Sequence, residues 1–295
     1  MSILFSYIII TYNRPNEVIA AIESISPESL ADAEVIVVDN GSTDDTISLI
    51  QEKFPWVLLI SSEQNLGVPG GRNLGIANSH GKYLIFLDDD AVISIPDISA
   101  KVRNAFEMLP LCGAVAFQIL DATTGEPSSG EFPGPDPKKR NESFETTYFV
   151  GCGFALKRTA VNKAGLFLKD YFFALEELDF SMRLMDAGYS IHYIPEVIVY
   201  HAHSAVRPTG RWFEYNLRSR FILTVRFLPV WAIIPHLLIW NVFIFIKAFR
   251  AGHIKAFFRG LLRGFSAIPL AMRLRQPLSS KMLKKIWQLK GRLFY

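Results

Sequence analysis

The sequence predicts an α/β fold, with a Rossmann-like and mostly parallel sheet flanked by helices, followed by a helical, basic and apolar C-terminal region. Three observations support this prediction. Short apolar, β-branched runs alternate with helical patterns through the first 92 residues. Residues 1–206 hold 14 basic and 27 acidic residues, whereas residues 207–295 hold 17 basic residues and one acidic residue, Glu214. Finally, residues 227–246 form a run of twenty residues without a charge.

The first predicted strand covers residues 3–10, and the next three cover residues 34–38, 57–60 and 82–87. Helical patterns at residues 17–25, 44–53 and 70–78 separate the strands. Each pattern lies at or just after residues that favour a helix start, which are Pro15-Asn16, Ser42-Thr43 and Pro69. Strands joined through helices in this way pair in parallel, and the ligands of such sheets bind beyond the carboxyl ends of the strands.

Composition excludes several classes of protein. Half of the residues are hydrophobic, which is too many for a generally disordered chain. Cys112 and Cys152 are too few for a disulfide framework and lack the spacing of a zinc site, so we expect reduced core thiols in a cytosolic compartment. The apolar N-terminus has neither a basic n-region nor a cleavage site, so it is interpreted as a strand rather than as a signal peptide.

Polar or acidic residues follow each of the four predicted strands. They are Thr11, Asn13 and Arg14; Asp39 and Ser42; Asn65; and Asp88, Asp89 and Asp90. Because the ends of parallel strands meet at one edge of a sheet, we expect these side chains to converge on one crevice. The segment Asp39 to Thr43 is also an ordinary turn and helix cap, so Asp39 taken alone has a structural interpretation as well.

Three consecutive carboxylates, those of Asp88, Asp89 and Asp90, are the strongest functional signal. They would repel one another at the end of a buried strand, and either a solvated turn or a bound cation relieves that repulsion. An Asp-x-Asp pair suits Mg²⁺ or Mn²⁺, which bind one or two carboxylates and complete their shells with phosphate oxygens and water. The pattern predicts a divalent-cation site, with a solvated acidic turn as the alternative.

Together these segments resemble the inverting glycosyltransferases of family 2, which have the GT-A fold and use nucleotide-diphosphate sugars. The resemblance rests on seven collinear motifs, at residues 9–14, 37–44, 65–75, 86–90, 151–154, 172–183 and 194–201. It covers about residues 3–205 and is specific to the superfamily rather than to one sugar. It implies a catalytic domain at residues 1–206, with a nucleotide-binding part at about 1–92 and an acceptor and catalytic part at about 93–206. A membrane-association region would follow at residues 207–295.

The resemblance also implies which residues bind the donor and the metal. The nucleotide sugar would contact Thr11, Asn13, Arg14, Asp39, Ser42, Gly71, Arg72, Asn73, Asp88 and Asp89. Asp90, Asp88 and His201 would hold the metal, Mg²⁺ or Mn²⁺. Because the family's motif is Asp-x-Asp, the additional Asp89 could share either task. His203 is an alternative ligand, since the period of two along a strand places it on the same face as His201.

Glu176 and Glu177 open a helical run that ends near Gly188. In the family, the second of two adjacent acids is taken as the base that removes the proton of the acceptor hydroxyl. Here that position is Glu177 in place of the usual Asp, and Glu176 remains the alternative. Acids in a helix's first turn also complement its dipole, which is a purely structural interpretation. Asp179 and Arg183 are four residues apart and are expected to form an ion pair within the helix.

Residues 121–145 are rich in proline and glycine and contain Lys138-Lys139-Arg140. A loop of this length in a compact domain is usually functional or mobile. We interpret it as a flap on the acceptor side of the site, with a surface insertion of no function as the alternative.

The C-terminal region combines apolar and basic residues. The uncharged run 227–246 is long enough to span a membrane, but Pro229 and Pro235 interrupt it. Residues 256–274 and 281–290 mix basic with apolar and aromatic residues, as helices in a membrane interface do. We expect peripheral, monotopic attachment to an anionic membrane surface at the cytoplasmic face of the cell membrane, with a span or a buried helix as alternatives. Nucleic acid is not an expected partner, because a long uncharged run does not suit a phosphate-tracking surface.

Arg211 and Arg218 precede the apolar run, and their spacing of seven residues places them on one face of a helix. They could reach either the diphosphate of the donor or the phosphates of lipids. Either form of membrane attachment suits an acceptor linked to a polyisoprenoid lipid.

The sequence therefore predicts a metal-dependent inverting hexosyltransferase of polysaccharide or cell-wall synthesis. It would move a sugar from a UDP- or dTDP-sugar to a lipid-linked or cell-surface glycan, and a rhamnosyltransferase-like leaning toward dTDP-rhamnose follows from the resemblance alone. One alternative is a sugar-1-phosphate nucleotidyltransferase, but this would need a glycine-rich phosphate loop where the chain has Thr11-Tyr12-Asn13-Arg14-Pro15. Another is a non-catalytic, membrane-bound scaffold that binds a nucleotide sugar.

Overall fold

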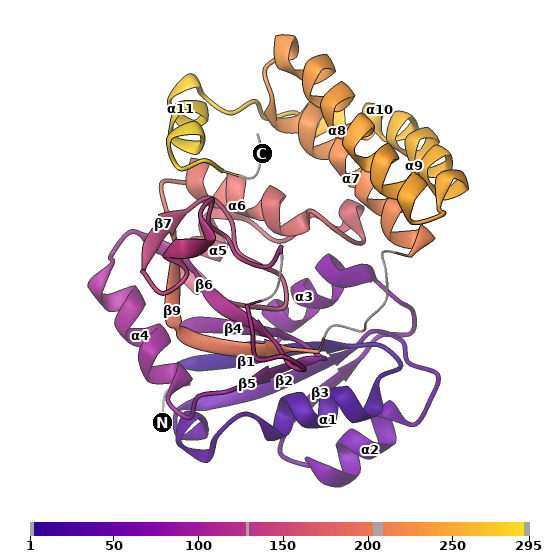
Figure 1. Cartoon of the computed structure of the whole chain (residues 1–295). Coiled ribbons are helices and arrows are strands. Elements are labelled where there is room, and N and C mark those ends of the chain that lie inside the picture. The colour runs from indigo at the N-terminus through magenta and orange to yellow at the C-terminus, as the bar shows by residue number, and fades with distance from the viewer. Residues whose placement is uncertain (1–2, 128–129, 203–208, 292–295) are drawn as a thin grey trace.

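A computed structural model of the chain describes residues 3–127, 130–202 and 209–291 (Figure 1). Its centre is a nine-stranded mixed sheet with the strand order β3-β2-β1-β4-β8-β6-β9-β5, and β7 pairs with β9 beside this path. The strands are β1 Phe5–Thr11, β2 Ala33–Asp39, β3 Leu58–Ser61, β4 Tyr83–Asp88, β5 Ala91–Ile93, β6 Cys112–Asp121, β7 Phe144–Thr146, β8 Gly153–Lys157 and β9 Ser190–His201.

Helices accompany the sheet and then continue the chain to its C-terminal end. The α-helices are α1 Pro15–Glu23, α2 Thr46–Lys53, α3 Gly67–Ala77, α4 Ile98–Met108, α5 Arg158–Ala164, α6 Glu176–Asp186, α7 Gly210–Phe227, α8 Val230–Arg250, α9 Ile254–Ser266, α10 Ile268–Arg273 and α11 Ser280–Gln288. Short 3₁₀ helices lie at Pro27–Leu30, Pro137–Lys139 and Lys169–Tyr171.

Four neighbouring strands, β3, β2, β1 and β4, are parallel to one another, as the sequence predicts. Strand β8 runs antiparallel between β4 and β6, and β9 pairs in parallel with β6. In the register of this sheet, Thr11 lies opposite Asp39, and Ile10 lies opposite Asp88. The carboxyl ends of β1, β2 and β4 therefore lie at one edge of the sheet.

The predicted α/β fold class is confirmed, and the predicted elements of the first 92 residues are present with small shifts at their ends. Each of these strands begins and ends within two residues of its predicted bounds. Helix α3 begins three residues earlier than predicted, at Gly67, because a proline such as Pro69 is tolerated in the first turn of a helix. Cys112 and Cys152 are both buried and unpaired, as predicted.

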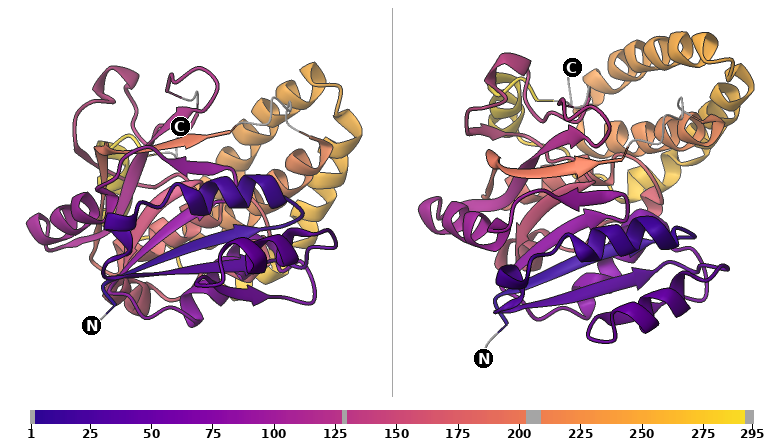
Figure 2. Two further views of the ribbon diagram at one scale, coloured as in Figure 1. Left: turned by 90° about the horizontal axis from the view of Figure 1, so that it is seen from below. Right: turned by 60° about the horizontal axis from the view of Figure 1, so that its bottom comes forward.

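The sheet is buried on both faces, with a layer of helices on each side (Figures 1 and 2). Because successive side chains of a strand point to opposite faces, Ile8 and Ile9 of β1 belong to two different cores. Ile9 shares its core with Val18 of α1 and Val102 of α4. Ile8 shares the other core with Ile76 of α3 and with residues of α5 and α6.

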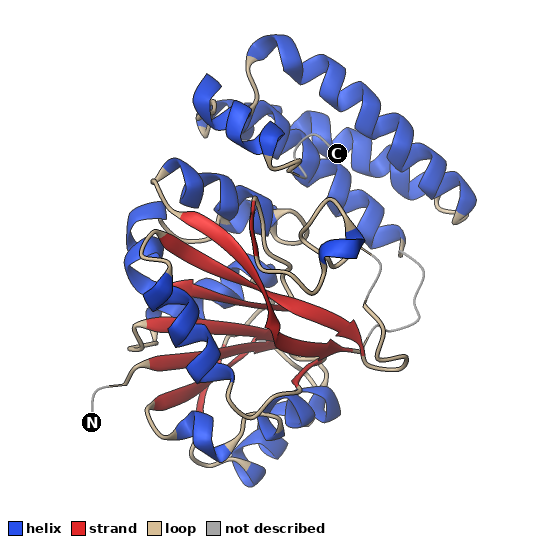
Figure 3. Cartoon of the chain, turned by 60° about the vertical axis from the view of Figure 1, so that its left-hand side comes forward, coloured by secondary structure: helices blue, strands red, loops and turns tan. Residues whose placement is uncertain are grey.

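Helices α7 to α10 form a further layer beyond α6 (Figure 1), and Figure 3 shows this group of helices on the side away from the sheet. Helices α7 and α9 pack closely because small residues lie at their contact, with Ala256, Gly260 and Gly264 spaced every four residues along α9. A Cβ atom on Gly260 would lie 2.9 Å from the Cα of Glu214, closer than a side-chain carbon normally approaches a backbone. Glycine at this position therefore sets the distance between the two helices.

The helical layer is joined to the core of the sheet. Ile222 of α7 and Ile286 of α11 are fully buried in the same core as Ile8. Arg226 of α7 also forms an ion pair with Asp179 of α6. The division of the chain at residue 206 stays a prediction, and its two sides share one hydrophobic core.

Among the described residues, α8 is the one helix long and apolar enough to cross a membrane, and only 11% of its most apolar window is buried in the protein. Most of its large apolar side chains point away from the rest of the chain. The exposed ones are Val230, Trp231, Ile234, Leu238, Ile239, Val242, Phe243, Phe245, Ile246 and Phe249 of α8, with Phe258, Leu262 and Phe265 of α9. We call these residues the apolar surface; contiguous apolar surface of this kind marks an interaction site.

Candidate active site

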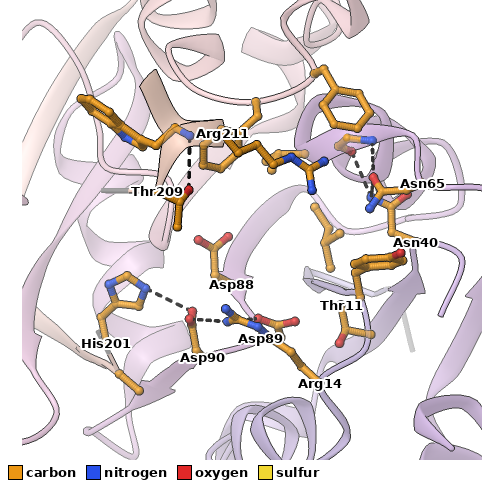
Figure 4. A pocket seen from close by; sticks show the side chains of 18 of the residues that line it. Thr11, Arg14, Asn40, Asn65, Asp88, Asp89, Asp90, His201, Thr209 and Arg211 are labelled. Atoms are coloured by element: carbon orange, nitrogen blue, oxygen red, sulfur yellow. Dashed lines mark hydrogen bonds and ion pairs between the residues drawn. The ribbon is translucent and has the colours of Figure 1, made fainter. Parts of the chain in front are cut away.

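A pocket of about 720 Å³ opens at the carboxyl ends of β1 and β4 (Figure 4). Residues of the predicted site and residues from distant segments line it together. The predicted lining residues are Thr11, Arg14, Asn65, Asp88, Asp89, Asp90 and His201. Further lining residues include Tyr12, Asn40, Glu131, Phe172, Phe173, Thr209, Arg211 and Trp212.

The consecutive carboxylates of Asp89 and Asp90 bind cationic partners from two other elements. Arg14, at the start of α1, donates hydrogen bonds to both, with 3.2 Å between its Nη1 and Asp89 Oδ1. His201, at the end of β9, places its Nε2 3.1 Å from Asp90 Oδ1. Figure 4 shows these side chains converging from the strand ends.

Burial controls the charge of this cluster. Burial raises the pKa of Asp88 to about 7, and the negative charge of Asp90 adds to the rise. Burial also raises the pKa of Asp89 to about 6. Burial acts in the same direction on Asp90, but the hydrogen bonds and charges of His201 and Arg14 together outweigh it and hold the pKa of Asp90 below its usual value. A cation between Asp88 and Asp90 would favour the charged form of both carboxylates.

Asp88, Asp90 and His201 form a donor set that fits a divalent cation. Their ligand atoms all lie within 4.8 Å of one another. Two carboxylates and one imidazole suit Mn²⁺ or Mg²⁺ and leave positions for phosphate oxygens and water. The structure thus brings the three predicted ligands together. The alternative ligand, His203, lies outside the described residues.

Glu131 supports His201 from the other side of the imidazole ring. Its Oε1 lies 2.9 Å from His201 Nδ1. Nδ1–H donates to Glu131, which fixes the orientation of the ring so that Nε2 faces Asp90, where it donates as Nε2–H or, with a cation bound, would offer its lone pair to the metal. Glu131 comes from the proline- and glycine-rich segment 121–145, so this segment does reach the pocket. The sequence contained no local signal for this particular residue.

Asn13, Asp39 and Ser42 form a group beside the pocket, and the pocket-lining residues do not include them. The buried Asp39 carboxylate accepts hydrogen bonds from the backbone N–H groups of Gly41 and Ser42, at 3.2 and 3.1 Å. The Ser42 hydroxyl accepts from the backbone N–H of Asn13, and Asn13 Oδ1 accepts from that of Thr43, both at 2.8 Å. These bonds join the loops after β1 and β2. The predicted contacts of the three residues with the donor stay predictions.

Arg72 lies at the centre of a buried ion-pair group behind the pocket. Its Nη1 donates to Glu176 Oε1 and its Nη2 to the carbonyl oxygen of Gly151, each at 3.0 Å. Its Nη2 also lies 3.7 Å from Asp88 Oδ1, which faces the pocket. A Cβ atom on Gly151 would collide with the Glu177 carboxylate, so glycine leaves the space in which these groups meet.

The two adjacent acids of α6 differ in their exposure. Glu176 is 2% exposed, and burial together with the charge of Glu177 raises the pKa of Glu176 to about 8. Glu177 is half-buried. The segment that leads into α6 contains three residues with positive φ angles: Phe172 at 59°, Ala174 at 66° and Leu175 at 67°. Residues with a Cβ atom rarely adopt such angles. Such strain is typical of functional sites, and here it sets the direction of the first turn of α6.

Gly71 and Asn73 support the pocket without lining it. Asn73 Nδ2 donates to the carbonyl oxygen of Phe167 at 2.8 Å, and Asn73 Oδ1 accepts from the N–H of Phe167 at 2.9 Å. A Cβ atom on Gly71 would lie 2.8 Å from Ile10 Cγ2, so this glycine allows α3 to pack against β1. Their predicted contacts with the nucleotide stay predictions.

The predicted ion pair between Asp179 and Arg183 is confirmed, with 2.8 Å between Arg183 Nε and Asp179 Oδ2. The structure adds two partners of Asp179, namely the Tyr171 hydroxyl at 3.3 Å and the guanidinium of Arg226. Asp179 thereby joins α6 to α7.

The first turn of α7 forms one wall of the pocket, through Thr209, Arg211 and Trp212. The Thr209 hydroxyl caps this helix by accepting a hydrogen bond from the N–H of Trp212 at 3.3 Å. Sequence reasoning singled out Arg211 but missed Thr209 and Trp212. A threonine three residues before a tryptophan is a helix-start signal that could have located this turn, although not its approach to the pocket.

Comparison with known proteins identifies the family. Residues 6–165 match the family model described as glycosyl transferase family 2, which is more than half of the chain. A second model, glycosyl transferase family group 2, matches residues 139–280. The chain belongs to glycosyl transferase family 2. The resemblance carried by the seven motifs is thereby confirmed, and the match favours a glycosyltransferase over the nucleotidyltransferase and the non-catalytic scaffold.

Two of the relatives of this glycosyltransferase have names that state a reaction. One, from Mycobacterium tuberculosis, is named N-acetylglucosaminyl-diphospho-decaprenol L-rhamnosyltransferase and is 24% identical over 99% of this chain and 100% of its own. Another, from Escherichia coli, is named UDP-Glc:alpha-D-GlcNAc-diphosphoundecaprenol beta-1,3-glucosyltransferase WfaP. It is 34% identical over 34% of this chain and 40% of its own. The chain covers 91% of a Haemophilus influenzae relative but between 16% and 36% of several other relatives.

The mannosyltransferase PcManGT from Pyrobaculum calidifontis, in complex with GDP-Man and Mn²⁺, is a structural neighbour. It superposes with a TM-score of 0.59 over 98% of this chain and 79% of its own, at 17% identity. At this identity the likeness supports the GT-A fold alone.

Proposed function

We propose that this glycosyltransferase transfers a hexose from a UDP- or dTDP-sugar to a lipid-linked glycan, with inversion at the anomeric carbon and dependence on Mn²⁺ or Mg²⁺. The observation that carries the proposal is the convergence of Asp88, Asp90 and His201 in one pocket at the strand ends. The names of the relatives from M. tuberculosis and E. coli support a diphospho-polyprenol acceptor.

Glu177 is the proposed base. In a single displacement, its carboxylate takes the proton of the acceptor hydroxyl while that oxygen forms a bond to the anomeric carbon. The bond between the anomeric carbon and the diphosphate oxygen breaks, and the nucleoside diphosphate leaves on the opposite side. A base must first reach its proton, and Glu176 is buried with one oxygen bonded to Arg72. Neither acid lines the pocket, but Glu177 is half-buried rather than fully buried, and this exposure favours it as the base; Glu176 acts through the position of Arg72.

Asp88, Asp90 and His201 are proposed to hold the divalent cation, which supplies positive charge to the leaving diphosphate when bound. Arg14 holds Asp89 and Asp90 in place through its hydrogen bonds. Thr11, Asn40 and Asn65 supply polar groups on the side of the pocket nearest β2, where the nucleoside of the donor would lie.

The apolar surface of α8 and α9 supports peripheral attachment at the cytoplasmic face of the cell membrane. Lys247, Arg250 and Lys255 lie among or beside these apolar side chains, as in helices that insert into the headgroup region of anionic lipids. Most of this surface belongs to α8, whose first turn follows directly on α7. The C-terminal end of α8 returns to the start of α7 at the pocket, where Lys247 Nζ lies 5.8 Å from the ring centroid of Trp212, so attachment through α8 would keep the pocket close to a lipid-linked acceptor.

The test is a panel of nucleotide sugars, each measured for thermal stabilisation of the purified protein with Mn²⁺ and with EDTA. A donor that binds only the folded protein raises its melting temperature. We expect one UDP- or dTDP-sugar to stabilise the protein in Mn²⁺ only, and its transfer product to show the inverted anomeric configuration by NMR. Equal stabilisation in EDTA, or a product that retains the donor configuration, would contradict the proposal.

A further inference from the structure

Arginines from two helices gather around one tyrosine at the mouth of the pocket. Tyr215 of α7 stacks on Phe172, which lines the pocket, with 5.2 Å between ring centroids. The Cζ atom of Arg211 lies 5.6 Å from the centroid of Tyr215 and 5.8 Å from that of Phe172. The Cζ atom of Arg263, from α9, lies 5.7 Å from the centroid of Tyr215.

Arg218 joins this group from the next turn of α7. It donates a hydrogen bond to the backbone carbonyl of Asp170, which lies just before Phe172 in the chain. Burial lowers the pKa of Arg218, the charge of Asp170 raises it, and the charge of Arg263 lowers it, so Arg218 and Arg263 are close enough to repel each other. We call Arg211, Arg218 and Arg263 the arginine cluster.

The arginine cluster has fewer negative than positive groups around it, with Asp170 beside Arg218 and Glu214 beside Arg263. Glu214 is the one acidic residue between 207 and 295, and it is shared between Arg259 at 2.7 Å and Arg263 at 3.5 Å. Arg211 forms no ion pair within the part of the chain that the structure describes; it lies over aromatic rings and points into the pocket (Figure 4). Like charges held close together are unfavourable unless an anion binds between them.

The position of the arginine cluster indicates which kind of anion it binds. Arg211 lines the pocket, whereas Arg218 and Arg263 do not, so the cluster extends from the pocket outward. On α9, Arg263 is flanked by Leu262 and Phe265, both exposed residues of the apolar surface. The cluster thus lies between a site for a sugar and a surface for a lipid chain, which is where the diphosphate of a prenyl-diphosphate sugar would lie.

We propose that Arg211, Arg218 and Arg263 bind the diphosphate that links the acceptor sugar to its prenyl chain. The assignment rests on the proposed lipid-linked acceptor. Guanidinium groups donate pairs of hydrogen bonds to phosphate oxygens, which makes arginine the preferred residue for such a group. The sugar of the acceptor then points into the pocket toward Glu177, and the prenyl chain runs along α9.

The test is calorimetric binding of farnesyl diphosphate, a short prenyl diphosphate that carries no sugar. The protein is first saturated with UDP, with free Mn²⁺ kept equal in cell and syringe, so that the donor diphosphate position is filled. The variants are Arg218→Gln/Arg263→Gln and, as a control that removes one charge from the same helical layer, Arg273→Gln at an exposed position of α10. Melting temperatures establish that each variant is folded.

We expect farnesyl diphosphate to bind the UDP-saturated protein and the double variant to bind it at least about tenfold more weakly, since charge-assisted bonds to phosphate are lost. Arg273→Gln should bind it as the unchanged protein does, and the double variant should keep its UDP affinity. Competition between UDP and farnesyl diphosphate would assign the cluster to the donor and overturn the proposal.

Two further outcomes distinguish an error in the proposed diphosphate site from an error in the proposed donor. If dihexanoyl phosphatidylglycerol displaces farnesyl diphosphate at similar concentration, the cluster binds lipid headgroups and the proposal is wrong. If UDP fails to bind while farnesyl diphosphate still requires Arg218 and Arg263, the proposed donor is wrong and the diphosphate site stands.

Discussion

The edge of the sheet and the helical layer hold their charges in opposite ways. At the sheet edge, three carboxylates lie on a strand end, where Arg14 and His201 bind two of them directly. In the helical layer a single acid, Glu214, faces many bases, and large apolar side chains are exposed. The first arrangement suits a cation and a phosphorylated substrate, and the second suits an anionic, apolar environment. The comparison shows that the proposed catalytic groups lie at the sheet edge and the proposed membrane-binding groups in the helical layer, although both regions share one hydrophobic core.

The largest expected effect is on chemistry at the sheet edge, through Glu177→Gln. We expect the transfer rate to fall about 10²–10⁴-fold, because the amide cannot accept the proton of the acceptor hydroxyl. Donor affinity should stay the same, as measured by calorimetry, since Glu177 is not expected to contact the nucleotide. Glu196→Gln, an exposed position on β9, is the matched control. Full transfer by Glu177→Gln would move the role of base to Glu176.

The next effect concerns the support of the metal site by Glu131. Removing the hydrogen bond to His201 Nδ1 in Glu131→Ala should weaken Mn²⁺ binding about 10–100-fold, as measured by electron paramagnetic resonance of free Mn²⁺. Glu131→Gln keeps a hydrogen-bond acceptor and should lose less affinity. The exposed Glu126→Ala in the same segment is the control. Unchanged Mn²⁺ affinity in Glu131→Ala would remove Glu131 from the site.

A smaller effect tests the packing of the helical layer. In Gly260→Ala, the new methyl group would meet the backbone of Glu214, and we expect the free energy of unfolding to fall by about 1–3 kcal/mol. Chemical denaturation measures this change. Lys255→Ala, at an exposed position of the same helix, should have little effect. A Gly260→Ala protein as stable as the unchanged one would show that α7 and α9 are not packed closely.

The smallest expected effect concerns attachment. Leu238 lies in the middle of α8 and is 62% exposed; we expect Leu238→Ser to lower partition onto anionic vesicles about tenfold, because one apolar side chain no longer enters the lipid. Leu166→Ser, at an exposed leucine outside the helical layer, is the control. High salt should release the protein only partly, since the apolar surface still binds. Complete release of the protein by salt would show that it binds vesicles through charge alone and would contradict insertion of the apolar surface.

The two regions also differ in how far the sequence predicts them. Strands and turns at the sheet edge are predictable from local patterns. Because parallel strands end at the same edge of a sheet, these patterns also predict that Thr11, Asp88 and Asp90 lie close together. The approach of Glu131 and Arg211 depends on contacts between segments far apart in the chain, for which a local pattern carries no signal. The same is true of Arg226, which pairs with Asp179 across 47 residues.

The C-terminal helix illustrates a related difference. Residues 281–290 have the amphipathic pattern of a membrane-interface helix, yet Ile286 of α11 is buried in the core of the catalytic region. Lys285 of the same helix forms an ion pair with Glu145 at 2.6 Å. An amphipathic pattern states that one face is apolar, and tertiary packing decides whether protein or lipid covers that face.

The central claim is that the strand-end carboxylates and His201 hold a cation that transfer requires. Its most direct test is the initial rate of glycosyl transfer as a function of free Mn²⁺ for the unchanged protein and for Asp90→Asn. We predict that EDTA abolishes transfer by the unchanged protein, that Mn²⁺ restores it, and that Asp90→Asn needs a far higher concentration of Mn²⁺. Transfer at the same rate in EDTA and in Mn²⁺, unaffected by Asp90→Asn, would contradict the claim.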